Sequence, residues 1–402
     1  AGDYLFAHCP ERVLPGNMLV FGSPDSAKMA GKLSRKEISA APKGDWKYHG
    51  FYRHGNEVIF SYLRDGKEWL ATAFDGEKEA AQSAHLTKGG PSQWPAWLES
   101  AGTLGAQKPF ATDTILPPAK NPYGTLFFLT GLDFFKDGTA AVCTMTGEVW
   151  LVKGLDARLG QVRWKRFATG LHHALGVKII EDRLYVLGRD QITRLHDLNG
   201  DDEADYYECV HNGMTTSPGG HDFIVGLDRD RQGRFYTASG KQGVLRLTPP
   251  DKVEILATGL RNPNGIGVDA AGRFVSSSVQ EGDWTPASAI CEIEVGFNEG
   301  AHFGAGGPRD GKAPTVPLLQ LPRGEDNSSS GQVYLGDDAW PKLSGQGNLL
   351  HASFGTGSVW VVSRQKVGGV WQGAAQRISG AMRSGAQHLR FNRKDGHLYV
   401  SG

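Results

Sequence analysis

The chain has 402 residues, enough for one large domain or two ordinary ones. Its 43 basic and 43 acidic residues cancel to a formal net charge of zero, so the charge does not indicate nucleic acid or an anionic membrane surface as a partner. No apolar run approaches the roughly 18 residues of a membrane-spanning helix, so no membrane span is expected. The 55 Gly and 20 Pro are spread along the chain, as many tight turns between short strands require.

Residues 1–124 are predicted to form an N-terminal extension. Its first 44 residues are expected to be irregular. A strand meander from Tyr48, YHGFYRHGNEVIFSYLRDGKEWLATAF, is interpreted either as ring-closing strands or as an extra blade. The polar, Gly- and Pro-rich residues 77–124 are interpreted as an insertion or linker, with PSQWPAWLESAG as a candidate short helix.

The four cysteines carry no metal- or haem-binding motif, because neither Cys-x-x-Cys nor Cys-x-x-Cys-His occurs. Buried free thiols are preferred over disulfides for Cys9, Cys143, Cys209 and Cys291. The chain starts AGDYLF without Met, which suits a processed, exported protein and predicts a periplasmic or secreted location.

From residue 125 a single phrase recurs: a short polar loop, an apolar strand, a Gly-marked turn and a second strand. Its six copies are LTGLDFFKDG, HHALGVKIIEDR, GGHDFIVGLDRDRQG, RNPNGIGVDAAG, NSSSGQVYLGDD and RSGAQHLRFNRKDG. Self-similarity at a period of roughly 40 to 50 residues is typical of propeller blades. Residues 125–402 are therefore predicted to be an all-β propeller of six or seven four-stranded blades, the last one truncated at LYVSG. A β-sandwich is the alternative, but it does not need the same phrase in every repeat.

Polar residues near the starts of these strands are expected to converge on one site, because the innermost strands of a propeller start near one end of its channel. These residues are Asp133, His172, His173, His221, Arg261, Asn262, Asp326, Asn327, Arg383 and His388.

The stretch SPGGHDFIVGLDRDRQGRFYTASGKQG, followed by GLRNPNGIGVDAAGRFVSSSVQEGDWTPASAICEI, resembles the glucose/sorbosone dehydrogenase family. That resemblance implies a propeller, usually six-bladed, that binds pyrroloquinoline quinone (PQQ) and calcium and oxidises a sugar or polyol. It makes His221 the general base, with Asp222 beside it, since imidazole accepts a proton near neutral pH. The residues it implies for cofactor contact are Arg261, Asn262, Arg383 and Trp284, and its calcium loop matches Gly282 and Asp283.

The sequence departs from that family at its cationic positions. Gly355 stands near the place of a Lys that reaches the quinone, and of the last blade's paired Arg residues only Arg383 lies in the entry loop. Fewer cations weaken the capture of an anionic cofactor, so PQQ binding is in doubt. Stretches such as GRDQITRLHDLNGDDEADYYEC and GGPRDGK resemble a group of large exported bacterial propeller proteins, some with cytochrome c modules. A cytochrome c is accordingly the implied electron acceptor.

An acidic loop within DLNGDDEADYYE predicts a structural calcium site away from the channel. It places oxygen-bearing side chains at positions one, three, five, nine and twelve, as calcium loops do. The expected ligands are Asp197, Asn199, Asp201, Asp205 and Glu208. A solvated acidic turn is the alternative interpretation.

Three functions stay open at this point. The first is PQQ-dependent oxidation of a sugar or polyol. The second is a metal-dependent lactonase-type hydrolase, with a cage built from Asp133, Asn262, Asn264 and Asp326. The third is a non-catalytic propeller that binds a glycan or a protein.

Overall fold

The computed structural model describes residues 18–22, 47–55, 57–64, 66–74, 83–106, 108–216, 222–282, 285, 287–306, 311–336, 340, 343, 347–379 and 382–402. Among these residues the regular elements are strands, apart from one short 3-10 helix, η3 (Ser83–Lys88). The all-β prediction is confirmed. The candidate helix PSQWPAWLESAG is wrong, because this stretch contains the strand β5 (Leu98–Ser100) and the first residue of β6 (Gly102–Thr103) and no helix. Of the cysteines in the described part, Cys143 and Cys291 are buried thiols, as predicted, whereas Cys209 is half-buried and forms no disulfide.

The chain divides into two compact units. Unit 1 comprises residues 1–96, 165–170 and 193–210. Its strands are ordered β1-β4-β3-β2-β15-β14 in one sheet. The bounds are β1 (Met18–Gly22), β2 (Lys47–His54), β3 (Glu57–Arg64), β4 (Lys67–Phe74), β14 (Ile192–His196) and β15 (Tyr206–His211). The predicted meander is thus present as β2, β3 and β4. It extends this sheet, because β2 pairs antiparallel with β15, with Tyr52 opposite Tyr206.

Unit 2 comprises residues 97–164, 171–192 and 211–402 and contains several separate sheets. The first is β5-β11-β10-β9-β8, with β8 (Leu129–Phe134), β9 (Ala140–Thr144), β10 (Val149–Lys153) and β11 (Val162–Ala168). A hairpin of β12 (Gly176–Ile180) and β13 (Arg183–Leu187) follows. The third is β16-β17-β18-β19-β23, with β16 (Ile224–Arg229), β17 (Phe235–Ser239), β18 (Gly243–Thr248), β19 (Lys252–Thr258) and β23 (Ala301–His302).

The remaining sheets of unit 2 continue in chain order. The fourth is β20-β21-β22-β24, with β20 (Ile266–Val268), β21 (Phe274–Val279), β22 (Ala287–Glu294) and β24 (Leu319–Pro322). The fifth contains β25 (Ser329–Tyr334), β26 (Leu349–Ser353), β27 (Ser358–Val367) and β28 (Val370–Ser379). The last pair is β29 (His388–Phe391) with β30 (Leu398–Ser401), and a two-stranded ribbon joins β6 (Gly102–Thr103) to β7 (Thr114–Ile115).

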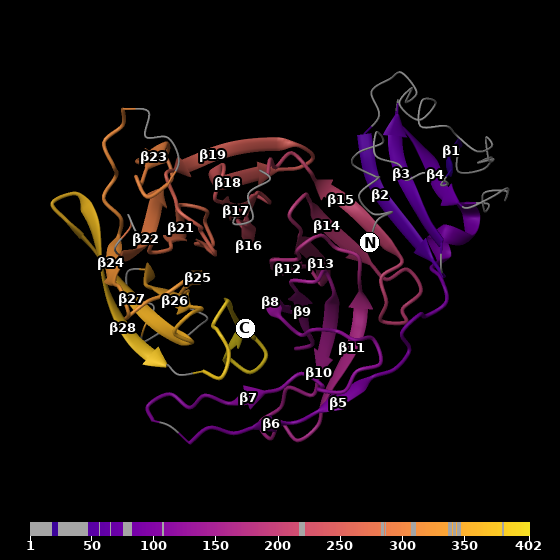
Figure 1. The fold of residues 1–402 in the computed structure, drawn as a ribbon, viewed down its shortest axis with the longest axis horizontal. Coiled ribbons are helices and arrows are strands. Elements are labelled where there is room, and N and C mark those ends of the chain that lie inside the picture. Colours follow the sequence, from indigo (N-terminus) through magenta and orange to yellow (C-terminus); the bar gives the residue numbers. More distant parts are fainter. Residues whose placement is uncertain are drawn as a thin grey trace. The chain divides into compact units, whose positions relative to one another are not determined.

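Six strands lie innermost in unit 2, each at the end of its sheet or hairpin. These strands, called the inner strands below, are β8, β12, β16, β20, β25 and β29, and they coincide with the six repeated phrases. Each contacts the next, and β29 contacts β8, so the contacts run in a ring (Figure 1). The loops that precede the inner strands are called the entry loops.

Glycines allow the inner strands to lie this close together. A Cβ added at Gly265 would collide with the carbonyl oxygen of Ser330 on the next inner strand, β25. A Cβ at Gly176 would lie 2.8 Å from the backbone nitrogen of Leu227, and one at Gly331 would lie 2.9 Å from the carbonyl oxygen of Gln387. At these three glycines the backbones of neighbouring segments are in direct contact, so no side chain larger than hydrogen fits.

Apolar side chains fill the space between neighbouring sheets. Tyr236 and Val244 of the third sheet share one buried cluster with Val275 and Ile293 of the fourth. Trp150, fully buried in the first sheet, anchors a cluster that Tyr399 of the last pair also joins. Alternate residues of each strand therefore face a neighbouring sheet on both sides, as packed propeller blades require.

The Gly- and Pro-rich residues 102–118 do more than link two segments. They run as a ribbon along one side of unit 2 (Figure 1). The ring of Phe110 lies 5.5 Å from that of Trp340, which lies 5.2 Å from that of Phe391, and the Thr112 hydroxyl lies 2.9 Å from that of Ser379. The segment thus packs against Trp340 and against β28 of the fifth sheet.

Gly265→Ala is expected to lower the free energy of unfolding by about 1–3 kcal/mol, because its methyl group would force two inner strands apart. Gly160→Ala is the matched control, since a Cβ there meets no atom within 4 Å, and its effect should stay within about 0.5 kcal/mol. Urea unfolding followed by tryptophan fluorescence measures both. Equal stabilities of the two variants would contradict the close packing inferred at Gly265.

Candidate functional site

The entry loops of three inner strands share an unusual backbone conformation. His173, Asn262 and Ser328 have positive φ angles of 48°, 41° and 52°. Each stands three residues before a glycine of the ring, so the positions are equivalent in the repeat. Non-glycine residues rarely adopt this conformation, and such strain concentrates at functional sites. These entry loops are therefore candidates for the functional site.

A chain of neutral polar side chains joins the entry loops of β20 and β25. The Asn262 amide donates to Gln280 Oε1 at 3.0 Å, and the Gln280 amide donates to the Ser328 hydroxyl at 3.0 Å. Ser328 in turn donates to Asn327 Oδ1 at 3.0 Å. We call Asn262, Gln280, Asn327 and Ser328 the amide network. The structure thus brings together two predicted site residues, Asn262 and Asn327, through two that the sequence analysis missed.

Arg261 holds the loop that follows β21. Its guanidinium donates to the carbonyl oxygens of Gln280, at 3.2 Å, and of Glu281. A Cβ at Gly282 would lie 2.6 Å from Arg261 Cζ, so the guanidinium packs directly on this glycine. Arg261 therefore uses hydrogen-bonding capacity on backbone carbonyls of the predicted calcium loop. Asp283 and Trp284 lie outside the described residues.

Glu281 places a buried carboxylate beside the amide network. Its Oε2 accepts from the Ser288 hydroxyl at 2.9 Å and from the Ser328 backbone N–H at 3.3 Å. It follows β21 directly and precedes Gly282, so its position in the hairpin loop could have been read from the sequence.

Asp222 is buried at the entry of β16. Its Oδ1 accepts from the Lys241 backbone N–H at 3.1 Å and from the Ser239 hydroxyl at 3.4 Å. This carboxylate therefore fastens the turn between β17 and β18. Its predicted neighbour in function, His221, lies outside the described residues, so its role stays a prediction.

Asp326 and His351 form a fully buried pair beneath Asn327. His351 Nε2 lies 3.3 Å from Asp326 Oδ2, which also accepts from the Ser329 hydroxyl at 2.5 Å. Burial alone would raise the pKa of Asp326, but the hydrogen bond and charge of His351 outweigh it and lower that pKa to about 2. The pair anchors the segment that carries the amide network's Asn327 and Ser328.

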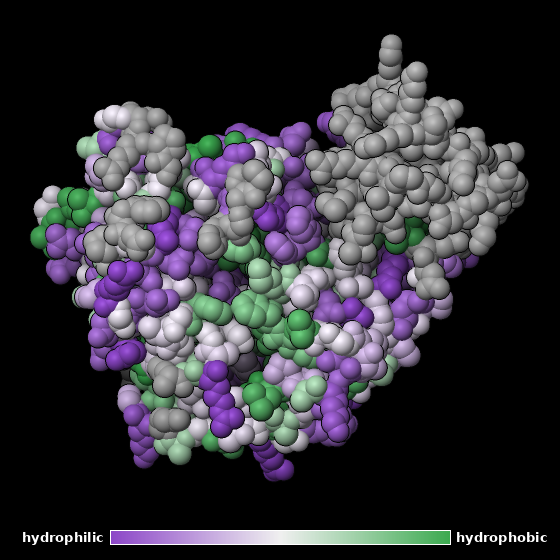
Figure 2. Space-filling model, viewed as in Figure 1, coloured by the Kyte–Doolittle hydropathy of each residue, from purple (hydrophilic) through white to green (hydrophobic). Residues whose placement is uncertain are grey.

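An aromatic side chain stands where a cation was expected. A Cβ at Gly355 would collide with Asn327 Oδ1, so no side chain fits at that position in this structure. The preceding Phe354 lies 5.9 Å from the ring of Phe128, and a Cβ at Gly385 would touch its ring. Arg383 is exposed. Hydrophobic residues also gather near the middle of the face of unit 2 seen in Figure 2.

His172 and His173 lie together at the entry of β12. Their rings are 5.0 Å apart, and His173 lies 6.1 Å from Phe223. Burial, and then the charges of His172 and Arg189, lower the pKa of His173 below its usual value. A neutral ring at this position suits hydrogen bonding better than anion capture.

Two residues expected at the entry loops lie elsewhere. Asp133 is the fifth residue of β8, and its Oδ2 accepts from the backbone N–H of Ile179 at 2.8 Å. His388 is the first residue of β29 but is buried, with Nδ1 accepting from the Leu132 backbone N–H at 3.2 Å. The cage proposed for a hydrolase is thus not assembled, since Asp133 lies toward the far end of β8 and Asp326 pairs with His351.

The acidic loop of unit 1 is closed by its own hydrogen bonds. Asp197 accepts from the backbone N–H groups of Gly200 and Asp202, and Asp205 accepts from those of Gly90 and Leu198. Asn199 donates to the carbonyl oxygen of Gly90. Burial raises the pKa values of Asp201 and Asp205, and the negative charges nearby add to this rise.

Glu208, the twelfth position of that loop, has other partners. It accepts from His196 at 2.7 Å and lies 3.6 Å from Arg194. No group of three or more His, Cys, Asp or Glu in the described part of the chain is placed to hold a metal ion. The calcium site stays a prediction.

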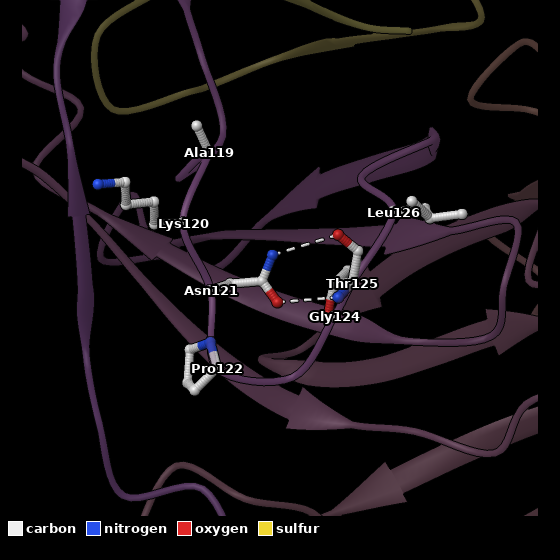
Figure 3. A pocket seen from close by; sticks show the side chains of 7 residues that line it. All are labelled: Ala119, Lys120, Asn121, Pro122, Gly124, Thr125 and Leu126. Carbon is white, nitrogen blue, oxygen red and sulfur yellow. Dashed lines mark hydrogen bonds between the residues drawn. The ribbon is translucent and has the colours of Figure 1, made fainter.

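A cavity of about 610 Å³ lies beside the segment that leads into β8 (Figure 3). Asn121 spans it, accepting from the Thr125 backbone N–H at 2.8 Å and donating to the Thr125 carbonyl at 3.2 Å. Lys120 and Leu126 also line it. Its polar groups largely satisfy one another, so it offers few free partners to a ligand.

No protein-family model matches the sequence, and no curated protein matches it. Solved structures do. A Thermus thermophilus protein described as an oxidoreductase (glucose dehydrogenase) is 16% identical with a TM-score of 0.53, over 70% of this chain and 92% of its own. A Trichoderma reesei protein of Carbohydrate-Active Enzymes Family AA12 is 12% identical with a TM-score of 0.52, over 78% and 96%.

A third structure, the PQQ domain of a pyranose dehydrogenase from Coprinopsis cinerea, is 14% identical with a TM-score of 0.49, over 69% of this chain and 91% of that one. The two structures with TM-scores above 0.5, described as a glucose dehydrogenase and as a carbohydrate-active enzyme, share the fold of this chain. The likeness concerns the fold. It confirms the resemblance inferred from the sequence at that level, while the identities are too low to carry an activity across.

In the described part of the chain, no helix is long and apolar enough to span a membrane.

Acid should remove the contribution of Asp326 to stability. Its pKa is lower in the folded chain than the usual 3.8, so its stabilisation is present above pH 4 and is lost as the pH falls toward 2. The loss amounts to about 2 kcal/mol. Between pH 5 and pH 2 the wild type should therefore lose about 2 kcal/mol more than Asp326→Asn in urea unfolding.

Asp251→Asn, an exposed carboxylate between β18 and β19, serves as the control and should follow the wild type. Parallel pH curves for the wild type and Asp326→Asn would contradict the assigned pair.

Proposed function

We propose that the entry loops of unit 2 bind a sugar or a polyol. The observation that carries this proposal is the amide network, in which Asn262, Gln280 and Ser328 are joined by hydrogen bonds of 3.0 Å. Amides and hydroxyls both donate and accept, so such a network matches the hydroxyl groups of a sugar. The strained backbone at Asn262 and Ser328 supports a site built for more than packing.

The aromatic ring near the network supports the same ligand class. Phe354 follows β26, and its backbone N–H donates to the Ser328 carbonyl at 3.1 Å, so its position is tied to the network. A flat ring can cover the apolar face of a sugar while amides bind the hydroxyl edge. The glucose dehydrogenase and carbohydrate-active proteins among the structural neighbours are consistent with this ligand class.

Oxidation of that sugar is the second candidate function. The glucose dehydrogenase-type fold and the His221–Asp222 pair of the sequence support it. In this hypothesis His221 accepts the proton of a sugar hydroxyl. The same hypothesis includes a six-bladed ring, export of the protein and a cytochrome c as the electron acceptor.

The described residues do not fit PQQ well. PQQ carries three carboxylates, which cations hold best. Arg261 is turned to two backbone carbonyls, Gly355 has no room for a side chain, and Arg383 is exposed. The buried carboxylate of Glu281 adds negative charge close by. Calcium meets the same difficulty, since the guanidinium of Arg261 already lies on carbonyls of the expected loop. No reaction step is therefore assigned to the quinone.

Gln280→Ala should weaken sugar binding about tenfold, because Gln280 links both entry loops and the loss of one or two hydrogen bonds costs about 1–1.5 kcal/mol. Isothermal titration calorimetry with a panel of monosaccharides and polyols measures this. Gln372→Ala removes an exposed glutamine of β28 and should bind like the wild type. Equal affinities of the Gln280 variant and the wild type, or no binding of any sugar, would sink the proposal.

PQQ with calcium is expected not to bind saturably at micromolar concentration, because the described cations are engaged or exposed. Quinone absorbance and thermal shift follow the titration. Saturable binding that Arg261→Ala abolishes, together with sugar-dependent dye reduction that His221→Ala abolishes, would overturn this expectation and establish the dehydrogenase.

A further inference from the structure

A second polar cluster lies among the inner strands, apart from the amide network. It consists of Lys178 on β12, Asp228 on β16, and His388 and Arg390 on β29. Asp228, His388 and Arg390 are buried. The proposed sugar site uses none of these side chains.

Arg390 reaches across the ring of inner strands. Its strand, β29, contacts β8 and β25, whereas β16 contacts β12 and β20, so the two strands lie on opposite sides. Arg390 Nη2 nevertheless donates to the carbonyl oxygen of Leu227 at 2.9 Å and lies 3.7 Å from Asp228 Oδ2. The guanidinium therefore lies in the channel and ties its two sides together.

The cluster holds two cations for one carboxylate. Lys178 Nζ lies 2.6 Å from Asp228 Oδ1. Burial alone would raise the pKa of Asp228, but the charges of Lys178 and Arg390 outweigh it and lower that pKa, so this carboxylate is ionised. The other acidic side chain on the described inner strands is Asp133, whose oxygens accept from the backbone N–H groups of Phe134 and Ile179. One positive charge of the cluster stays uncompensated by its own carboxylate.

Two buried donors of the cluster have no protein partner. The Leu132 backbone N–H donates to His388 Nδ1, so the ring proton stands on Nε2, and that atom is buried without a partner. Burial, and then the charge of Arg390, hold the pKa of His388 well below its usual value, so the ring is neutral. Arg390 Nε is also buried without a partner. Residues two apart in a strand face the same side, so both donors lie on one face of β29.

We propose that a small inorganic anion of about the size of chloride binds in the channel, accepting from His388 Nε2 and Arg390 Nε and balancing the charge of Lys178. A buried donor without an acceptor is costly, and a buried unbalanced charge is more so. One anion removes both costs. It also ties β29 more firmly to β12 and β16, so it stabilises the ring rather than taking part in a reaction.

Water is the competing occupant. Gln332 Oε1 on the adjacent strand β25 is also buried without a partner, and a water molecule could donate to it while accepting from His388. Water leaves the charge unbalanced, whereas an anion does not. The two occupants therefore differ in charge, and experiments with a halide ion can distinguish them.

Bromide distinguishes them, because it scatters anomalously and water does not. Crystals of the whole chain, with chloride replaced by bromide, should show an anomalous peak within about 3.5 Å of both His388 Nε2 and Arg390 Nε. A peak of ordinary water density without anomalous signal would overturn the proposal.

A solution experiment tests the charge requirement. At constant ionic strength, replacing methanesulfonate by bromide should raise the Tm along a saturating curve by about 2–4 °C. Lys178→Gln should abolish that rise, whereas Lys252→Gln, an exposed lysine, should keep it. A rise that persists in Lys178→Gln, or no rise in the wild type, contradicts the proposal. Should Lys178→Gln fail to fold, the anomalous map of the wild type decides alone.

Discussion

Backbone-to-backbone contact between neighbouring inner strands is the constraint on which unit 2 depends. A Cβ at Gly176, Gly265 or Gly331 would meet backbone atoms of the next inner strand or its entry loop. Because no side chain separates the strands there, the strands begin at nearly the same level and their entry loops are brought together. The apolar clusters between the sheets supply most of the burial, but they could fill many arrangements. The glycines select this one.

That ring places two different chemistries in one channel. At the entry loops, neutral amides and hydroxyls hold one another at 3.0 Å, and the nearest charges, Arg261 and Glu281, are engaged with backbone and hydroxyl groups. Deeper among the strands, the buried Arg390 and Asp228 and the partly exposed Lys178 together carry net positive charge. A neutral ligand fits the first environment and an anion fits the second. The proposed site for a neutral sugar is thus separate from the charged side chains that link opposite inner strands.

The sequence predicted the strands far better than the site. All six repeated phrases coincide with inner strands, because alternation and glycine turns are local signals. The surroundings of a side chain depend on distant parts of the chain and are not set by local sequence. Asp133 was expected at an entry loop but is the fifth residue of β8, since its phrase begins at the first residue of the strand and has no loop residues before it. Gln280 was missed because its role depends on hydrogen bonds to residues 18 and 48 positions away.

A neutral ligand is proposed to bind at the entry loops, and this binding is open to a direct test. A crystal structure of the chain soaked in the sugar that binds most tightly tests it most directly. We expect sugar density within about 3.2 Å of the side chains of Gln280 and Asn327. Density confined to another place, such as the cavity that Asn121 spans, would contradict it.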